Sequence, residues 1–551
     1  MSPLSKFVVL AALAASVSVP NAYADKKTVC TITVNSANEK DTLRRWLPAS
    51  DYQFVELVER GRPDWLASAC RAGVHCDVLV ISGHFDDGTQ FYSDRLDARE
   101  SLPVEALQRA SCSDSCPGVF SQLKEVYLFG CNTLNGDALH SASAEIGRSL
   151  IRSGHAPDDV ERLTRLINDR HADSNRDRMR QIFKDVPVIY GFSSKAPLGA
   201  TAGPLLERYL QAGGAAEVSS GRPSAKLLTL FGPTSMVAAR GATDADPNAG
   251  YLRQSCRFVD SRESTADKLR FVHQLLDGEM AEVRMFLEPI EKVVSALDAS
   301  TRATPAVAEA LHGIAHDGAA RERYLAFARD ADELSTRTRM LGVAGELGWL
   351  SAAQQRAEMV RALDERLARS TTTAADVDLV CTLNRDGALD ALLTDLKVTP
   401  SRSVAQSALL ACLGSEPARA RVLQALTSPS DDDVQMAQVY LRHRPIVDPA
   451  ELRVLAAGIT RMQGSDAQIR ALDTLAKQQL DDRESLEALA GLFPQARSIG
   501  VQRAIAGILI RSDYRAIARP ELVRLLRERR LKSPDGEDVI DVLVRRMQAS
   551  S

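Results

Sequence analysis

The chain has 551 residues, of which 45% are hydrophobic and 25% are charged, and its formal net charge is −4. This composition excludes a collagen-like or wholly disordered chain, and the near-neutral charge gives no support to a nucleic-acid partner. At about 150 residues per domain, the length predicts three or four domain-sized units.

Residues 1–24 have the features of a secretory signal peptide. Lys6 gives a positive start, residues 7–17 form an uncharged apolar run, and Ala22-Tyr23-Ala24 supplies the A-x-A pattern at which signal peptidases cut. The apolar run is too short to cross a membrane, which needs about 20 residues. We therefore expect cleavage after Ala24, a mature chain without a membrane span, and export to a bacterial periplasm, where cysteines are oxidised.

Residues 25–262 alternate between strand-like and helix-like segments. Short β-branched and aromatic runs predict strands at residues 29–34, 52–58, 77–82, 125–129 and 186–192. Helical patterns lie between them, at residues 41–47, 63–72, 104–110, 138–153 and 203–211. This alternation predicts an α/β domain in which a mostly parallel sheet is covered by helices on both faces.

The rest of the chain is expected to be all-α, with a helical domain at residues 263–400 and helical repeats at residues 401–551. A weak repeat places Ala408, Ala437, Ala471 and Ala504 at intervals of 29, 34 and 33 residues. Such periods are typical of stacked helix pairs, and the pattern resembles HEAT repeats, which offer extended surfaces to protein partners. The alternative is an irregular helical bundle.

Two reactive side chains follow two predicted strands. The strand at residues 77–82 leads into Gly83 and His84, and the strand at residues 125–129 leads into Gly130 and Cys131. Parallel strands end at one edge of a sheet, so two neighbouring strands would bring His84 and Cys131 together. Imidazole can take the thiol proton, and a helix expected soon after Cys131 would favour the thiolate.

The runs VLVISGH and VYLFGC, with 47 residues from histidine to cysteine, resemble the caspase-like cysteine peptidases of clan CD. That family includes caspases, legumain, gingipains, separase and CHAT-type bacterial proteases, and the resemblance covers residues 27–240. It implies a caspase-like α/β fold with His84 as general base and Cys131 as nucleophile. Nearby backbone amides would bind the oxyanion, the substrate would be a protein or peptide, and no metal or organic cofactor would be needed.

The sequence departs from the family pattern at two positions. The family usually has glycine directly after the histidine, where this chain has Phe85, and often alanine or serine before the cysteine, where it has Gly130. A bulky residue after His84 could crowd the cleft. The alternative function is therefore a catalytically inactive caspase-like platform whose helical repeats bind protein partners.

Three further residues are candidates for the substrate pocket. Asp86 and Asp87 follow the presumed base and could attract a basic substrate side chain, although loop acids are commonly just solvated. Ser193 follows the strand predicted at residues 186–192, at the same sheet edge, where clan CD enzymes often build part of the substrate cleft. The charge-rich segment at residues 156–185 is expected to be a solvated helix, with a lid or a cleavable linker as alternatives.

The nine cysteines can form four disulfides and leave Cys131 alone. The pairing that we consider first is Cys70–Cys76, Cys112–Cys116, Cys381–Cys412 and Cys30–Cys256. Sequence leaves this connectivity open, because Cys70 and Cys76 could instead cross to Cys112 and Cys116. A zinc site made by those four cysteines and His75 is a further alternative, although their spacings match no common zinc template.

Overall fold

The chain forms two units, an α/β unit made of residues 1–143 and 156–268 and a helical unit made of residues 144–155 and 269–551. The computed structural model describes residues 26–57, 65–85, 88–93, 100–137, 143–170, 174–369, 372–396, 403–463, 465–478, 480, 482–532 and 538–550. The predicted signal peptide therefore lies outside the described residues. Among the described residues, no helix has the length and apolar character needed to span a membrane.

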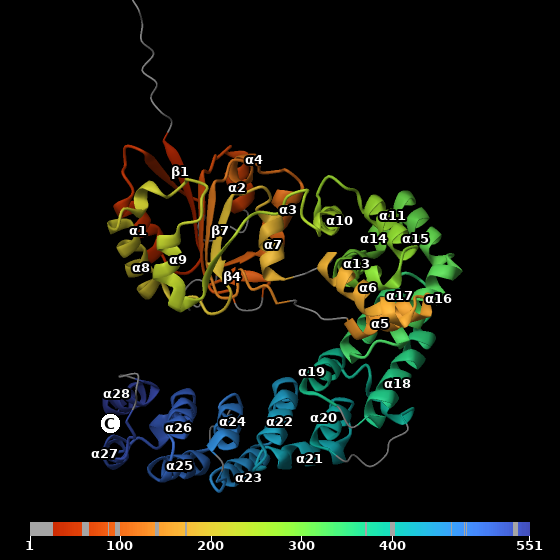
Figure 1. The fold of residues 1–551 in the computed structure, drawn as a ribbon. Coiled ribbons are helices and arrows are strands. Elements are labelled where there is room, and N and C mark those ends of the chain that lie inside the picture. The colour runs from red at the N-terminus through yellow and green to blue at the C-terminus, as the bar shows by residue number, and fades with distance from the viewer. Residues whose placement is uncertain are drawn as a thin grey trace, which may run out of the picture. The chain divides into compact units, whose positions relative to one another are not determined.

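The α/β unit is built on a six-stranded sheet with the strand order β2-β1-β3-β6-β7-β8 (Figure 1). The strands are β1 (Lys27–Thr33), β2 (Tyr52–Glu56), β3 (Val78–Ser82), β6 (Glu125–Phe129), β7 (Val188–Phe192) and β8 (Met236–Ala239). Within this sheet, only β8 runs antiparallel to its neighbour. A separate hairpin joins β4 (Gln90–Tyr92) to β5 (Ser101–Pro103). The mostly parallel sheet confirms the predicted layout, while β4, β5 and β8 were not anticipated.

Helices cover both faces of this sheet, as the strand–helix alternation predicts (Figure 1). One face, called here the α1 face, packs against α1 (Asn38–Trp46), α8 (Gly199–Gln211) and α9 (Ala225–Phe231). The other, the α3 face, packs against α2 (Trp65–Arg71), α3 (Val104–Cys112), α4 (Pro117–Phe120) and α7 (Asn175–Ile182). The unit also contains α6 (Pro157–Arg170), α10 (Ala249–Val259) and the short 3-10 helices η1 (Gly214–Ala216) and η2 (Gly232–Thr234).

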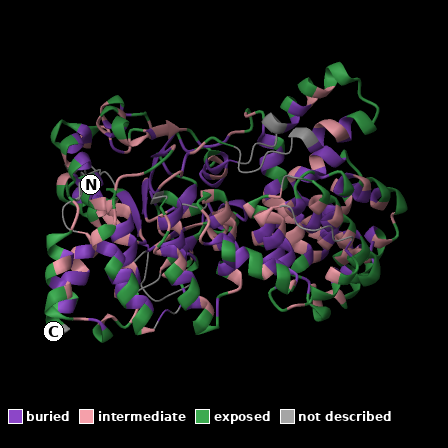
Figure 2. Ribbon diagram, turned by 90° about the horizontal axis from the view of Figure 1, so that it is seen from below, coloured by how far each residue is buried: buried purple, intermediate pink, exposed green. Residues whose placement is uncertain are grey.

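The central strands are buried on both faces because each face contributes to an apolar core. All five residues of β3 and of β6 are buried, and much of the sheet is coloured as buried in Figure 2. Alternate residues serve opposite cores: Val78 and Val80 pack on the α1 face, and Leu79 and Ile81 pack on the α3 face. This explains why the strands read as continuous apolar runs, and it fixes which way each side chain points.

The segment between β6 and β7 is divided between the two units. Helix α5 (Ser143–Arg152) lies within the predicted helix at residues 138–153, but residues 144–155 belong to the helical unit. Helix α6 is largely exposed, whereas α7 contributes Met179 and Ile182 to the core of the α3 face. The expectation of one solvated helix at residues 156–185 is therefore wrong for α7.

The helical unit begins with α5 and the helices that follow the α/β unit. These are α11 (Thr265–Leu276), α12 (Met280–Met285), α13 (Leu287–Ser295), α14 (Ala299–Arg302), α15 (Pro305–Ala315), α16 (Gly318–Arg329), α17 (Leu334–Glu346), α18 (Ala352–Ala368) and α19 (Ala374–Leu383). Ile146 and Leu150 of α5 are buried, and Glu145 accepts a hydrogen bond from Arg284 Nε at 3.2 Å. Helix α5 is thus an integral part of this unit, although it is inserted from the β6–β7 connection.

The remainder of the helical unit is a row of helix pairs. It comprises η3 (Asp390–Thr394), α20 (Val404–Cys412), α21 (Glu416–Ala425), α22 (Asp431–His443), α23 (Pro449–Ile459), α24 (Ser465–Leu475), α25 (Arg483–Leu492), η4 (Phe493–Gln495), α26 (Ile499–Arg511), η5 (Tyr514–Ala516), α27 (Pro520–Glu528) and α28 (Val539–Ser550). The repeated alanines lie on α20, α22, α24 and α26, and all four are buried. Each of these helices contacts the next one in the series.

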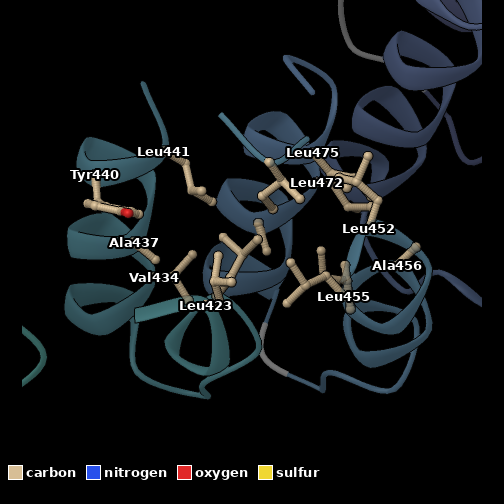
Figure 3. Packing of buried hydrophobic residues seen from close by; sticks show 14 of the residues in the cluster. Leu423, Val434, Ala437, Tyr440, Leu441, Leu452, Leu455, Ala456, Leu472 and Leu475 are labelled. Carbon is tan, nitrogen blue, oxygen red and sulfur yellow. The ribbon is translucent and has the colours of Figure 1, made fainter. Parts of the chain in front are cut away.

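Apolar side chains join successive pairs into one continuous core. Figure 3 shows Leu441 of α22 pointing toward Leu472 of α24, and Leu455 of α23 belongs to the same apolar cluster. This core extends from Leu334 to Met547, so it crosses the predicted boundary at residue 400, and the helical region forms one unit. This continuous core confirms the predicted helical repeat as a series of stacked helix pairs. The pairs stack because one pair alone could not cover its apolar face.

Four disulfides are formed, and only Cys381–Cys412 among them was in the first predicted pairing. The others are Cys30–Cys76, Cys70–Cys116 and Cys112–Cys256. The predicted pairs Cys70–Cys76, Cys112–Cys116 and Cys30–Cys256 are wrong, because the cysteines pair across neighbouring strands and helices instead of closing short loops. The Cys70–Cys116 bridge agrees with the crossed alternative. Since Cys70, Cys76, Cys112 and Cys116 are all oxidised, the alternative zinc site is also wrong.

The insertion of α5 predicts a measurable contribution from its buried ion pair. Glu145→Gln leaves the Arg284 guanidinium, whose side chain is 9% exposed, without its counter-charge. We expect the helical unit to lose about 3 kcal/mol of unfolding free energy, measured by urea titration. Replacing both residues, by Leu and Met respectively, should cost less than the single change.

The control for this experiment is Arg148→Gln, which removes a solvent-exposed ion pair of α5 with Asp332. It should cost less than about 1 kcal/mol, because exposed pairs are screened by water. Equal losses in the Glu145→Gln and Arg148→Gln variants would contradict the assigned role of the buried pair.

Candidate active site

The candidate site lies at the carboxyl ends of β3 and β6. Each β3 residue pairs with the β6 residue 47 positions later, as Ser82 does with Phe129. The Gly83 N–H extends this ladder by donating to the Phe129 carbonyl at 3.1 Å. The same offset of 47 separates His84 from Cys131. The two residues therefore follow neighbouring strand ends at the same level, and such strands lie about 4.8 Å apart.

Side-chain alternation places His84 and Cys131 on the same face of the sheet. Val80 of β3 and Phe129 of β6 belong to the α1-face core, and steps of two residues lead from them to His84 and Cys131. Phe85 takes the opposite direction and is fully buried in the α3-face core. The bulky residue after the histidine thus does not crowd the face on which the two reactive side chains lie.

Phe85 and Gly130 are fitted to each other. A Cβ atom on residue 130 would lie 2.8 Å from Phe85 Cβ and 3.0 Å from the Gly83 carbonyl oxygen. The Phe85 ring also packs on Phe91, with ring centroids 4.6 Å apart. The two departures from the family pattern are therefore one structural feature, because the phenylalanine fills space that a side chain at residue 130 would need.

His84 is half-buried and is held by the β4 strand. The backbone N–H of His84 donates to the Tyr92 carbonyl at 2.9 Å, and the backbone carbonyl of His84 accepts from the Tyr92 N–H at 2.9 Å. The two rings lie 5.4 Å apart between centroids. The unpredicted hairpin of β4 and β5 thus extends the sheet edge beyond β3 and fixes the backbone that carries His84.

Cys131 is half-buried and is the one cysteine outside the four disulfides, as predicted. Its Sγ accepts a hydrogen bond from the Ala196 N–H at 3.3 Å. Ala196 lies in the loop after β7, so three successive strand ends contribute to the site.

A tight turn, and not a helix, follows Cys131. Asn132 has a positive φ of 59°, a conformation that asparagine adopts more readily than most residues, and its N–H donates to the Ser194 carbonyl at 2.7 Å. Thr133 Oγ1 donates to the Gly130 carbonyl and accepts from the Phe192 N–H, both at 3.1 Å. The described residues 131–137 contain no helix, and the next described helix, α5, belongs to the helical unit from residue 144 on, so no described helix supplies the expected dipole at Cys131.

Of the three predicted pocket residues, only Ser193 lies in the part of the chain that the structure describes. Ser193 lies at the same sheet edge, but its hydroxyl donates at 3.3 Å to the carbonyl of Ser235, the residue directly before β8. Asp86 and Asp87 lie outside the described residues. Leu198, directly before α8 in the loop that also holds Ala196, has 68% of its surface exposed. It gives this loop an apolar side chain that the sequence analysis did not single out.

Glu39 is a buried acid that the sequence analysis missed. It lies in the first turn of α1, after the carboxyl end of β1, and is only 2% exposed. Its Oε2 atom has no hydrogen-bond partner among the described residues. Burial raises the pKa of Glu39 to about 7, while bonds to its own backbone and to Ser36 oppose that rise. A single glutamate in an amphipathic helix carries no sequence signal that separates it from a surface acid.

Comparisons of the chain with protein-family models, with curated proteins and with solved structures found no match.

The fit between Phe85 and Gly130 can be tested by a double-mutant cycle. Gly130→Ala should lower the unfolding free energy of the α/β unit by about 1–3 kcal/mol, because the new methyl group overlaps Phe85 Cβ. In a Phe85→Gly background the same change should cost clearly less. Urea unfolding of the wild type, both single variants and the double variant measures this coupling, and an equal cost in both backgrounds would refute it.

Glu39 predicts a specific pH dependence of stability. Its folded-state pKa of about 7 exceeds the ordinary value of 4.5, so between these values the folded state binds more protons than the unfolded state. Stability must then fall as the pH rises from 4.5 to 7, by about 3 kcal/mol in total. Glu39→Gln removes this loss, so the variant should gain stability relative to the wild type at pH 8 but not at pH 4.5. Parallel pH profiles for the two proteins would contradict the prediction.

Proposed function

We propose that the α/β unit is a caspase-like cysteine endopeptidase in which Cys131 is the nucleophile and His84 the general base. The observation that carries this proposal is the β3–β6 register, which brings the two residues to the same level of one sheet edge. The oxidation of the eight other cysteines supports it, because Cys131 alone retains a thiol. The burial of Phe85 in the α3-face core removes the main objection from sequence.

The proposed reaction is acyl transfer through a thioester. His84 takes the proton of Cys131, and the thiolate attacks the peptide carbonyl carbon to form a C–S bond. The C–N bond then breaks as His84 returns the proton to the leaving amine. Water, deprotonated by His84, hydrolyses the thioester and restores the thiol. The Ala196 N–H at 3.3 Å from Sγ stabilises the attacking sulfur while it is negative.

Backbone amides supply the remaining electrostatic stabilisation in this proposal. The amides of Gly83, His84 and Asn132 donate to the carbonyls of Phe129, Tyr92 and Ser194. The oxyanion of the tetrahedral intermediate is therefore assigned to the amides of Phe85 and Cys131. The turn held by Thr133 orients the Cys131 amide. Residues of this chain suffice for the reaction, and the proposal invokes no cofactor.

The helical unit is proposed to recruit the protein substrate or a partner. The stacked pairs contain a groove of about 770 Å³ between α20 and α23. Its lining includes Arg419 and Glu451, which are joined by paired hydrogen bonds of 2.8 and 2.7 Å, and Val447, which is 86% exposed. Rows of helix pairs present extended surfaces of this kind. We also propose export to a periplasm, which the four disulfides support.

The peptidase proposal predicts that Cys131→Ala abolishes cleavage of a mixed peptide library. Full-length protein and the variant are incubated under mild reductant, with and without calcium and after limited proteolysis. The variant should lose a factor of about 10³ or more in rate. His84→Ala should lose a comparable factor, and the double variant should be no slower than either single variant, because the two residues act as a unit.

Ser193→Ala is the matched control, because the serine hydroxyl is directed at Ser235. It should keep wild-type cleavage within a factor of about two. Equal cleavage by the wild type and Cys131→Ala, or no cleavage by the wild type under any of these conditions, would refute the peptidase. Those results would favour the alternative function, an inactive platform that presents the helical repeats.

A further inference from the structure

A cluster of metal-ligating side chains lies in the first part of the helical unit, and the peptidase proposal does not use it. His273 is in the last turn of α11, and Asp277 follows one helical turn later. The Asp277 N–H donates to the His273 carbonyl at 3.2 Å, so the helical path continues to residue 277. Side chains four positions apart on such a path share one face.

The third member, Asp317, comes from a different part of the chain, between α15 and α16 (Figure 1). Its Oδ1 accepts from the Ala320 N–H at 2.9 Å, which fixes the carboxylate at the start of α16. Its Oδ2 accepts from His273 Nε2 at 3.1 Å. The ligand atoms of His273, Asp277 and Asp317 all lie within 4.8 Å of one another.

These distances suit a small divalent ion. Zinc binds imidazole nitrogen and carboxylate oxygen at about 2.0–2.2 Å, so two neighbouring ligands of one zinc ion are about 3.0–3.5 Å apart. His273 Nε2 and Asp317 Oδ2 already have that separation. His273 is 31% and Asp317 21% exposed at the side chain, so both are partly shielded, whereas Asp277 is 62% exposed and accessible to an ion.

We propose that His273, Asp277 and Asp317 form a binding site for a zinc-type divalent transition metal. One imidazole and two carboxylates form a mixed nitrogen and oxygen donor set, which zinc accepts and which calcium and magnesium, as oxygen-seeking ions, do not favour. Three protein ligands leave one coordination position for water. The ion replaces the proton that His273 Nε2 shares with Asp317, and it connects the end of α11 to the α15–α16 turn.

Two neighbouring features allow this site to be tested: a positive charge that opposes the bound cation, and an alternative pair of metal-binding histidines. Arg323 Nη2 lies 3.9 Å from Asp277 Oδ1 and also donates to the Leu276 carbonyl at 3.2 Å. Its positive charge opposes a cation at Asp277, so removing that charge should strengthen metal binding. The second feature is a pair of exposed histidines, His312 of α15 and His316 directly after it, whose ring centroids are 3.9 Å apart. Two histidines at this spacing are an alternative donor set for the same metals.

The test is calorimetric titration of the full-length chain with zinc chloride, in a Cys131→Ala background so that the free thiol cannot bind the metal. We expect one site per chain, with no comparable heat from calcium or magnesium. Asp277→Asn and His273→Gln should each weaken zinc binding about tenfold or more, because even outer-shell changes at metal sites cost that much. Arg323→Gln should tighten binding. Bound Co²⁺ should show visible absorption without a thiolate charge-transfer band.

His316→Gln is the matched control and should leave the zinc affinity within a factor of about two if the proposed cluster holds the ion. Loss of binding in His316→Gln with retention in Asp277→Asn would overturn the proposal and assign the ion to the histidine pair. Absence of any stoichiometric zinc binding by the folded Cys131→Ala chain would overturn it as well. Circular dichroism of each variant confirms that the helices remain folded.

Discussion

The parallel pairing of β3 with β6 is the constraint on which the candidate site depends. Both strands are buried on both faces, so a slip of one residue would exchange the side chains of two different cores. The register is therefore held by packing along the whole strand and not by contacts at the site. Because that register has an offset of 47 residues, it also determines that His84 and Cys131 leave the sheet side by side. The packing of the two cores therefore also sets the relative positions of His84 and Cys131 on which the proposed reaction depends.

The same pleat explains how Phe85 and Gly130 fit together beside the candidate site. Alternation sends Phe85 into the α3-face core, where its Cβ occupies the space beside residue 130. Gly130 is the residue that tolerates such a neighbour. Considered separately, Phe85 and Gly130 each weaken the resemblance of the sequence to caspase-like peptidases. In the structure, Phe85 and Gly130 fit each other, and the reactive side chains on the opposite face of the sheet are unaffected.

Sequence patterns predicted the layout well because the layout depends on periodicity. The strands that flank the site and the helix pairs marked by Ala408 and Ala504 follow from runs and repeats that any buried strand or stacked helix must show. Disulfide partners do not follow from such patterns. Cys30 pairs with Cys76 because β1 and β3 are neighbours in the sheet. Glu39 was missed for a related reason: its pKa depends on what covers it, and helix propensity does not encode the covering residues.

The most consequential feature that the sequence did not reveal is the membership of α5. A helix inside the β6–β7 connection was predicted, but its partners are Arg284 and the segment around Asp332, far along the chain. The turn that carries Cys131 is therefore joined through the same connection to a helix that folds with the other unit. A truncation after residue 268 would remove those partners and expose Ile146 and Leu150, which are buried in the full chain. The α/β unit is thus not an independent module at this boundary, and the chemistry proposed for Cys131 has to be studied in the full-length protein.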